Sequence, residues 1–541
     1  MRLKKDSTEQ KLRGAYYTPL QLSNAMVGLF ASEDIGEILE PSCGDGVFID
    51  SLMQNQMLNA KNSITAIEIE KAEAQKVAQV YANNKNVNVI NTDFFDFYEE
   101  NYKVKRYNLI LGNPPYIRYQ YLTEKQRAIQ SKILVDHGMK SNKLINAWVC
   151  FLVACVQMLA DNGKIAFVVP AEILQVAYAE DLRLFLSSQL SKITLITFEK
   201  LIFPDIQQEV VVFIGEKGKQ EKGIRIIEMN DLSDFSKLDL SKNGYQKLQH
   251  VKEKWTKYFI SSKEIEIIQD IRTDARFVKL SDLGVINVGI TTGNNDYFSV
   301  DQATVEEYEL KPIVLPLIGR SSHAHGIYFT QDDWIKNVNS GKKAMLVNFS
   351  DDSMDKLLPK HVKYILKGEK EKQNIGYKCS IRENWFVVPS VWVPDAFFLR
   401  RNNLYPKFVL NRCGAVSTDT MHRIKFNEDV DAETAMLSYY NSISFAFTEL
   451  CGRSYGGGVL EILPGEVGNI MLPIIKELDE DTKKYLLKEI DDVVRKNEDI
   501  EQALNLVDNH LLVKFLGIDE VLCQKCRVIW KKLQKRRLGR A

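Results

Sequence analysis

The chain has 541 residues, 45% of them hydrophobic, and this length predicts roughly two to four domains with separate buried cores. Its 71 basic and 71 acidic residues cancel, so net charge lends no support to a nucleic-acid-binding protein, although basic side chains could still cluster on one face. No apolar run approaches the roughly 20 residues of a membrane span, and the polar N-terminus and eight dispersed cysteines predict a cytoplasmic protein with reduced thiols and no membrane association.

Apolar segments of strand length alternate with helix-like segments through the first part of the chain. This alternation predicts a parallel, doubly wound α/β sheet. Two further apolar segments, 193–198 and 210–214, fit a pair of strands at the end of the sheet. The expected strands are 36–40, 64–69, 87–90, 107–111 and 164–169, and the expected helices are 47–59, 71–83, 143–160 and 178–190.

A glycine-rich turn follows the first expected strand, in the sequence IGEILEPSCGDGVF at residues 35–48. Gly44 and Gly46 would let the backbone approach a ligand closely. The turn lacks the Gly-Lys-Ser/Thr of a phosphate-binding loop and carries Glu40 and Asp45, which disfavour a polyphosphate. Because carboxylates suit a cationic ligand, the turn predicts the sulfonium cofactor S-adenosylmethionine.

Acidic residues also follow the second and third expected strands. Glu68 stands where doubly wound folds place an acceptor for a ribose hydroxyl, and Ile69 beside it is a second candidate contact. Asp93 and Phe94 could accept a hydrogen bond from an adenine amine and cover its ring. The alternative for each carboxylate is a helix N-cap that involves no ligand.

The sequence YNLILGNPPYIRY at residues 107–119 places Asn113, Pro114, Pro115 and Tyr116 directly after an apolar strand. The amine of a base is a poor nucleophile because its lone pair is delocalised into the ring, so a catalyst must hold the nitrogen in a more tetrahedral form. The Asn113 amide oxygen and the Pro114 carbonyl are two fixed acceptors, since proline locks φ and lacks an N–H. Tyr116 offers a flat face for stacking, worth roughly 1–3 kcal/mol per base. The motif predicts amine methylation; the alternative is a proline-rich loop that caps a buried strand.

These motifs, in this order, resemble the γ-class, TaqI-like amino-methyltransferases of type II restriction-modification systems, which transfer methyl to adenine N6 in DNA. In the γ order the cofactor motifs precede the catalytic motif and the recognition region follows. The resemblance is strong over residues 14–215 and continues more loosely to around residue 473. The segments that carry it are GAYYTP at 14–19, EPSCGDGVF at 40–48, AIEIE at 66–70, NTDFFDF at 91–97, NPPY at 113–116, KIAFVVP at 164–170 and the pair Phe203 and Pro204.

The resemblance implies a class I S-adenosylmethionine-dependent methyltransferase fold with an antiparallel strand at the end of its sheet. It also implies S-adenosylmethionine as cofactor, double-stranded DNA as partner and no metal, with the target base flipped out of the duplex at a cost of roughly a few kcal/mol. Asn113 and the Pro114 carbonyl would hold the adenine amine, with Tyr116 and Phe203 on the two faces of the base. The residues implied in cofactor binding are Thr18, Glu40, Gly44, Gly46, Glu68, Ile69, Asp93, Phe94, Asn113 and Pro115.

The second half of the chain has features of a recognition domain. VINVGITTGNNDYF at 285–298, STDTMHR at 417–423 and SYGGGVL at 454–460 resemble segments of related adenine methyltransferases. Basic side chains here could contact DNA phosphates or base edges, or form ordinary structural salt bridges. The candidates are Arg320, His323, Arg400, Arg401, Arg412, His422, Arg423 and Arg453.

Composition changes after residue 220, where a polar, lysine-rich passage at 223–258 predicts a linker. Periodic structure resumes from Ile265. The expected domains are a catalytic domain at 1–240, a mixed α+β target-recognition domain at 241–473 and a helical region with a basic tail at 474–541.

The C-terminal region predicts amphipathic helices at 474–516, broken near Asn497, because its apolar residues are spaced mostly three or four apart among charges. The final segment, 524–541, has eight basic residues and no acidic one. It would either bind phosphate or fold on the acidic helices before it. Cys523 and Cys526 form a single CxxC, which without a second pair does not predict a zinc site.

Three functions compete on this sequence. A sequence-specific DNA adenine N6 methyltransferase of a restriction-modification system accounts for both halves, and the sequence leaves open whether a companion restriction endonuclease acts on the same site without a stable complex. An NPPY-type methyltransferase acting on RNA or on a protein glutamine would share only the catalytic core. The third function is that of a binding or nuclease subunit in which methylation is secondary. The motifs begin within 20 residues of Met1, so we expect no nuclease domain upstream, and the sequence leaves open a nuclease in the second half.

Overall fold

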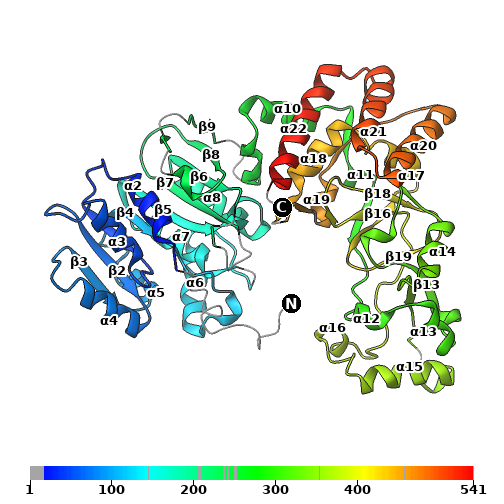
Figure 1. Cartoon of the computed structure of the whole chain (residues 1–541), viewed down its shortest axis with the longest axis horizontal. Coiled ribbons are helices and arrows are strands. Elements are labelled where there is room, and N and C mark those ends of the chain that lie inside the picture. The colour runs from blue at the N-terminus through cyan, green and yellow to red at the C-terminus, as the bar shows by residue number, and fades with distance from the viewer. Residues whose placement is uncertain are drawn as a thin grey trace. The chain divides into compact units, whose positions relative to one another are not determined.

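The computed structural model describes residues 17–143, 145–200, 202–203, 209–235, 238–240, 243–248, 253–351, 354–455 and 457–539 (Figure 1). The chain divides into two compact units, residues 1–262 and 263–541, named here the N-terminal unit and the C-terminal unit. Within the described ranges, every helix is too short or too polar to cross a lipid bilayer.

A nine-stranded sheet organises the N-terminal unit. Its strands are β1 (Glu37–Glu40), β2 (Ser63–Glu68), β3 (Val87–Asn91), β4 (Tyr107–Gly112), β5 (Leu159–Pro170), β6 (Lys192–Phe198), β7 (Val210–Glu216), β8 (Gly223–Met229) and β9 (Gln246–Lys247). Their spatial order is β3-β2-β1-β4-β5-β7-β6-β8-β9. The first five strands of this order are mutually parallel, and β7 is antiparallel to both of its neighbours. The expected class I methyltransferase sheet is confirmed, but its antiparallel strand β7 lies between β5 and β6 and not at the end, because β8 and β9 extend the sheet beyond β6.

Helices precede and connect the strands of this unit (Figure 1). They are α2 (Leu20–Gly28), α3 (Val47–Gln54), α4 (Lys71–Val80), α5 (Phe94–Asn101), α6 (Glu124–Asp136), α7 (Ala147–Gln157), α8 (Glu180–Gln189) and α9 (Leu232–Phe235). Nearly all of β4 and the whole second half of β5 are buried, since central parallel strands are covered on both faces. For that reason these strands read in the sequence as continuous apolar runs rather than as alternating patterns.

The passage expected to be a linker instead begins with a strand of the sheet. β8 pairs in parallel with β6 along its whole length. Its Ile224 and Ile227 are buried, and Arg225 reaches past them to donate hydrogen bonds to the carbonyls of Leu240 and Asn243. The linker prediction was wrong here because it rested on the lysine-rich composition of the whole passage. The structure of β8 is decided by the apolar residues within the strand.

The C-terminal unit is mixed α+β, as expected. Its strands are β10 (Phe277–Lys279), β11 (Gly284–Val288), β12 (Ser299–Val300), β13 (Val314–Ile318), β14 (Tyr328–Phe329), β15 (Met345–Val347), β16 (Ala396–Leu399), β17 (Arg401–Asn402), β18 (Phe408–Asn411), β19 (Val416–Ser417), β20 (Met421–Phe426), β21 (Arg453–Tyr455), β22 (Val459–Glu461) and β23 (Met471–Pro473). The largest sheet has the order β11-β20-β16-β18-β14, which leaves β11 at an edge. Smaller sheets have the orders β12-β15-β13-β19, β17-β22-β21 and β10-β23.

Helices make up much of the rest of this unit. They are α10 (Ser262–Thr273), α11 (Leu280–Leu283), α12 (Asn295–Phe298), α13 (Gln302–Glu307), α14 (Gln331–Asn339), α15 (Pro359–Lys370), α16 (Tyr377–Ser380), α17 (Ala432–Leu437), α18 (Ser442–Cys451), α19 (Pro464–Gly468), α20 (Glu480–Lys496), α21 (Ile500–Val507), the π-helix η10 (Asp508–Phe515) and α22 (Glu520–Leu538). The expected break between amphipathic helices is confirmed, because α20 ends at Lys496 and the next residue, Asn497, adopts the left-handed conformation with φ 58°.

The basic tail folds as helix α22 and packs on α18. Arg527 forms an ion pair with Asp508 at 3.0 Å, and Lys531 forms one with Glu501 at 2.6 Å. These acidic partners belong to the helices that precede the tail. The sequence left open whether the tail binds phosphate or folds on the acidic helices before it. Arg527 and Lys531 fold on those helices.

Candidate active site

The glycine-rich turn leads from β1 into α3 and is held against the end of β2. Gly44 and Gly46 have φ of 53° and 86°, in the left-handed region that favours glycine. A Cβ at Gly46 would lie 3.2 Å from Val77 Cγ1, so the turn is also closely packed. The Gly44 N–H donates to Glu68 Oε2 at 2.9 Å. Two of the predicted cofactor motifs therefore meet at the carboxyl ends of neighbouring strands.

Three carboxylates gather around this turn. Glu40 at the end of β1 is only 1% exposed, and burial, followed by the charges of Asp45 and Glu68, holds its pKa well above the ordinary value. Burial also raises the pKa of Asp45 and of Glu68, against the opposing effect of the backbone N–H groups that each accepts. None of the three forms an ion pair with a described residue, and Glu40 Oε2 has no hydrogen-bond partner among them. Three neighbouring carboxyl groups without an ion pair suit a cationic ligand, whose charge would stabilise their ionised forms.

Asp93 caps the helix that follows β3. Its Oδ1 accepts from the Phe95 N–H at 2.8 Å, and its Oδ2 accepts from Gln126 Nε2 at 2.8 Å. The helix-cap role that the sequence left open is thus present, and each oxygen retains a lone pair for a further contact. Phe94 is buried and stacks on Phe151, with ring centroids 4.9 Å apart. Sequence reasoning missed Gln126, since only the fold brings α6 to the end of β3.

The NPPY segment follows β4, which pairs directly with β1. This pairing brings the segment beside the glycine-rich turn, where Ser42 Oγ donates to the Asn113 carbonyl at 3.4 Å. The Tyr116 hydroxyl donates to the Val168 carbonyl of β5 at 3.1 Å. Tyr116 also packs against the apolar cluster that contains the buried Phe203. The predicted catalytic motif and the predicted cofactor turn therefore share one edge of the sheet.

The other predicted site residues lie near the same strand ends. Thr18, just before α2, is buried, whereas Ile69, just after β2, is 55% exposed and free to cover a ligand. Pro114 is buried and Pro115 is partly so. Part of the N-terminal motif, residues 14–16, and Pro204 with the rest of its loop lie outside the described residues.

Comparison with known proteins extends over both units. A family model for the Eco57I restriction-modification methylase matches residues 20–203, and a model for the C-terminal domain of the type II methyltransferase M.Eco57I matches residues 252–512. The chain is also 24% identical to the type II methyltransferase M.AccI of Acinetobacter calcoaceticus, over 92% of this chain and 93% of that protein. The chain belongs to the type II restriction-modification methyltransferases.

A second curated relative agrees with that assignment, and a solved structure shares the fold of this type II methyltransferase. The type II methyltransferase M.HindII of Haemophilus influenzae is 27% identical over 56% of this chain and 58% of its own length. The solved structure of the Type IIL restriction-modification enzyme MmeI in complex with DNA has the same fold, with a TM-score of 0.58 and 12% identity over 98% of this chain and 80% of that one. The family carries out sequence-specific DNA methylation, and fold and family imply S-adenosylmethionine as methyl donor.

The residues predicted to contact DNA have different surroundings in the C-terminal unit of the methyltransferase. Four of the arginines pair with carboxylates, and both histidines are buried, with pKa values that burial lowers, to about 4 for His323. Arg423 is buried beside a pocket and pairs with no described carboxylate. The paired arginines are Arg400 and Arg401 with Glu461, Arg412 with Glu433, and Arg453 with Glu466.

Proposed function

We propose that the protein transfers a methyl group from S-adenosylmethionine to adenine N6 in duplex DNA at a specific sequence, with the target base flipped out of the helix. The observation that carries this proposal is the meeting of the NPPY segment and the glycine-rich turn at adjacent strand ends, joined by the hydrogen bond from Ser42 to the Asn113 carbonyl. The order of the motifs, with cofactor elements before NPPY and a recognition region after it, supports adenine as the target.

Asn113 and Pro114 activate the amine in this proposal. The Asn113 side-chain oxygen and the Pro114 carbonyl accept the two N–H groups of adenine N6, which draws the nitrogen lone pair out of the ring. The two prolines fix these acceptors, since their φ angles are locked before the base arrives. Catalysis then consists chiefly of orientation, which alone can remove roughly 7–11 kcal/mol of a bimolecular barrier.

Tyr116 holds the flipped base by stacking, and its ring is itself anchored. The hydroxyl bond to Val168 and the apolar cluster behind the ring fix its plane. Phe203 belongs to the same cluster and would approach the other face of the base. An adenine inside a duplex cannot reach such a site while stacked, so flipping precedes transfer.

The residues around the glycine-rich turn fit the cofactor. The carboxylates of Glu40, Asp45 and Glu68 have raised pKa values and form no ion pair with a described residue, as expected of groups that face a positively charged ligand. S-adenosylmethionine, when bound, supplies a methyl group bonded to a sulfonium sulfur. The thioether that remains after transfer is a good leaving group. Glu68 would hold the ribose, and Asp93, Ile69 and Phe94 would hold the adenine ring.

Cofactor affinity is expected to weaken at acid pH. The raised pKa values mean that Glu40 and Glu68 take up protons at a higher pH than ordinary glutamates, and a neutral carboxyl no longer attracts a cation. The affinity should fall by up to about tenfold per pH unit for each carboxylate that must lose its proton on binding. Calorimetry across a pH series, in buffers of different ionisation enthalpy, measures both the affinity and the protons released.

The matched variant for this prediction is Glu40→Gln, which keeps the shape of the side chain and removes its titration. It should weaken cofactor binding at neutral pH and flatten the pH dependence. A wild-type affinity that does not change with pH would show that the carboxylates face something other than the cation.

Two Tyr116 variants separate the ring from its hydroxyl. Tyr116→Ala removes stacking and should lower kcat/KM by about 10- to 100-fold, from the roughly 1–3 kcal/mol that stacking contributes. Tyr116→Phe keeps the ring and loses only the bond to Val168, worth roughly 0.5–1.5 kcal/mol, so a fall of several-fold is expected. Equal losses in steady-state assays would assign the effect to the hydroxyl and contradict the stacking role.

An acceptor assay tests the proposed function. Purified protein is incubated with labelled S-adenosylmethionine and, separately, bacterial genomic DNA, bulk RNA or cell protein, and the products are digested and identified by mass spectrometry. The proposal predicts that only the DNA sample contains a methylated product, and that this product is N6-methyldeoxyadenosine. Formation of N4-methylcytosine would show that the target base is cytosine and not adenine. Methylation of RNA or of glutamine would show that duplex DNA is not the substrate.

A further inference from the structure

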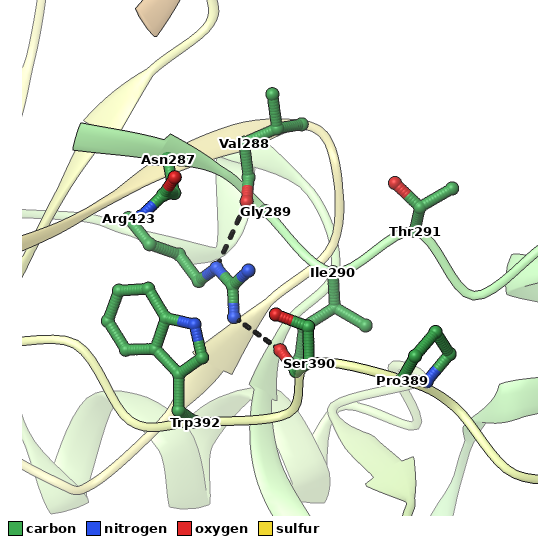
Figure 2. Close-up of a pocket in the computed structure, with 9 residues that line it drawn as sticks. All are labelled: Asn287, Val288, Gly289, Ile290, Thr291, Pro389, Ser390, Trp392 and Arg423. Atoms are coloured by element: carbon green, nitrogen blue, oxygen red, sulfur yellow. Dashed lines mark hydrogen bonds between the residues drawn. The ribbon is translucent and has the colours of Figure 1, made fainter.

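A pocket in the C-terminal unit lies beside the edge strand β11. Its volume is about 370 Å³, and Arg423 of β20 and Trp392 form one side of it (Figure 2). Among the described strands β11 pairs with β20 alone, so one row of its backbone groups is not used by the sheet. Gly289 at the end of the strand tolerates no side chain, since a Cβ would lie 1.9 Å from the Thr418 carbonyl oxygen. The pocket therefore has a rigid wall of backbone.

Arg423 is a buried cation with no neutralising partner among the described residues. Its side chain is 4% exposed. Nε donates to the Val288 carbonyl at 3.0 Å and Nη1 to the Ser390 carbonyl at 2.8 Å, and the guanidinium lies 4.3 Å from the Trp392 ring centroid (Figure 2). All of these partners are uncharged. The contacts fix the guanidinium plane, and Nη2 donates no hydrogen bond to a described residue.

Arg423 differs from four of the other arginines that the sequence made candidates for DNA contact. Those at positions 400, 401, 412 and 453 each pair with a glutamate, so their charge is already balanced. A buried charge is costly unless it is paired. An arginine that is oriented by neutral groups, and that borders an open pocket, is arranged to receive an anion from outside the chain.

We propose that this pocket binds a phosphate of the DNA backbone through Arg423. The proposal rests on the proposed function, because it takes duplex DNA as the substrate. A phosphate projects from the duplex and can enter a concave site, whereas reading a base edge requires a side chain that projects into the groove. The planar guanidinium suits phosphate oxygens, and the fixed backbone wall would set the register of the recognition unit on the duplex.

Two variants test the site by different routes. Arg423→Gln removes the cation. Asn287→Asp leaves Arg423 in place but adds a carboxylate directly across the strand pair, since Asn287 and Arg423 are cross-strand partners and Asn287 is exposed. Asn339→Asp, an exposed position at the end of α14 outside the pocket, is the matched control. Thermal unfolding of each variant checks that the C-terminal unit remains folded.

The readout is the affinity of the full chain for duplexes with and without its methylation site, across a salt series. Arg423→Gln should weaken binding to both duplexes equally, by about tenfold or more, and should lower the slope of log affinity against log salt by about 1. Asn287→Asp should act in the same direction, and Asn339→Asp should not. Unchanged affinity and slope in Arg423→Gln would overturn the proposal. A loss of affinity for the site-bearing duplex alone, together with methylation of a less specific motif, would also overturn it, because that result indicates that Arg423 reads a base.

The same titrations with single-stranded RNA separate this proposal from the proposed function. A wild-type chain that binds RNA but not duplex DNA would contradict DNA as the substrate. The RNA backbone carries the same phosphate group, so a lowered salt slope for Arg423→Gln on RNA would still support the phosphate site, and an unchanged slope would overturn it.

Discussion

Replacing Asn113 by alanine is expected to lower the rate of methyl transfer by about 10²- to 10³-fold or more, the usual cost of removing one preorganised hydrogen-bonding group from a catalytic site. The side chain is assigned to the amine of the base, so the affinity for S-adenosylmethionine should remain nearly unchanged. Single-turnover methylation assays give the rate, and calorimetry gives the cofactor affinity.

Asn108→Ala is the matched control for this experiment. Asn108 lies on β4, the strand that leads to Asn113, near its amino end, where its side chain accepts from the Glu37 N–H at 3.2 Å. This variant should retain transfer activity. Equal loss of activity and cofactor binding in Asn113→Ala would indicate a structural role for Asn113, and retained transfer would remove it from the mechanism.

The second large effect is expected from Arg537→Met in the C-terminal unit. Arg537 and Glu449 are both buried and form an ion pair at 2.7 Å, and Arg537 also donates to the carbonyls of Asn403 and Gly458. Removing the arginine leaves Glu449 buried without its cation, which should cost roughly 3–5 kcal/mol in the free energy of unfolding. Urea unfolding followed by circular dichroism measures this loss.

The pH dependence identifies the cause of that loss. Burial raises the pKa of Glu449, and the charge of Arg537 opposes this shift. Without Arg537 the pKa rises further, so the folded variant keeps Glu449 protonated. Its deficit should be smallest below the ordinary glutamate pKa and should grow as pH rises. A second substitution, Glu449→Leu, should restore most of the stability; no restoration would place the loss in the backbone contacts of Arg537.

The catalytic half of the fold could be predicted from the sequence because its strands are buried on both faces and its turns carry distinct residues. Glu40, Glu68 and Asp93 end apolar segments, and parallel strands bring such ends to one edge of a sheet. The structure accordingly brings the glycine-rich turn beside both Glu68 and the NPPY segment.

The contacts that orient these residues could not be predicted. Gln126 reaches Asp93 from a helix far along the chain, and the Val168 carbonyl that anchors Tyr116 is a backbone atom with no sequence signature. Strand β8 was not predicted, because the lysine-rich residues around it dominate the composition of that passage. The candidate arginines of the second half could not be separated from the sequence either, because only the tertiary structure shows which of them has a glutamate as partner.

Single-molecule sequencing of genomic DNA tests the central claim most directly. A methylation-deficient bacterial host expresses either this chain or its Asn113→Ala variant at equal levels. The account predicts N6-methyladenine at one short motif with the wild-type chain and none with the variant. An unmodified genome, from cells whose purified protein binds S-adenosylmethionine, would contradict duplex DNA as the substrate, and modification that persists in the variant would contradict the role of Asn113.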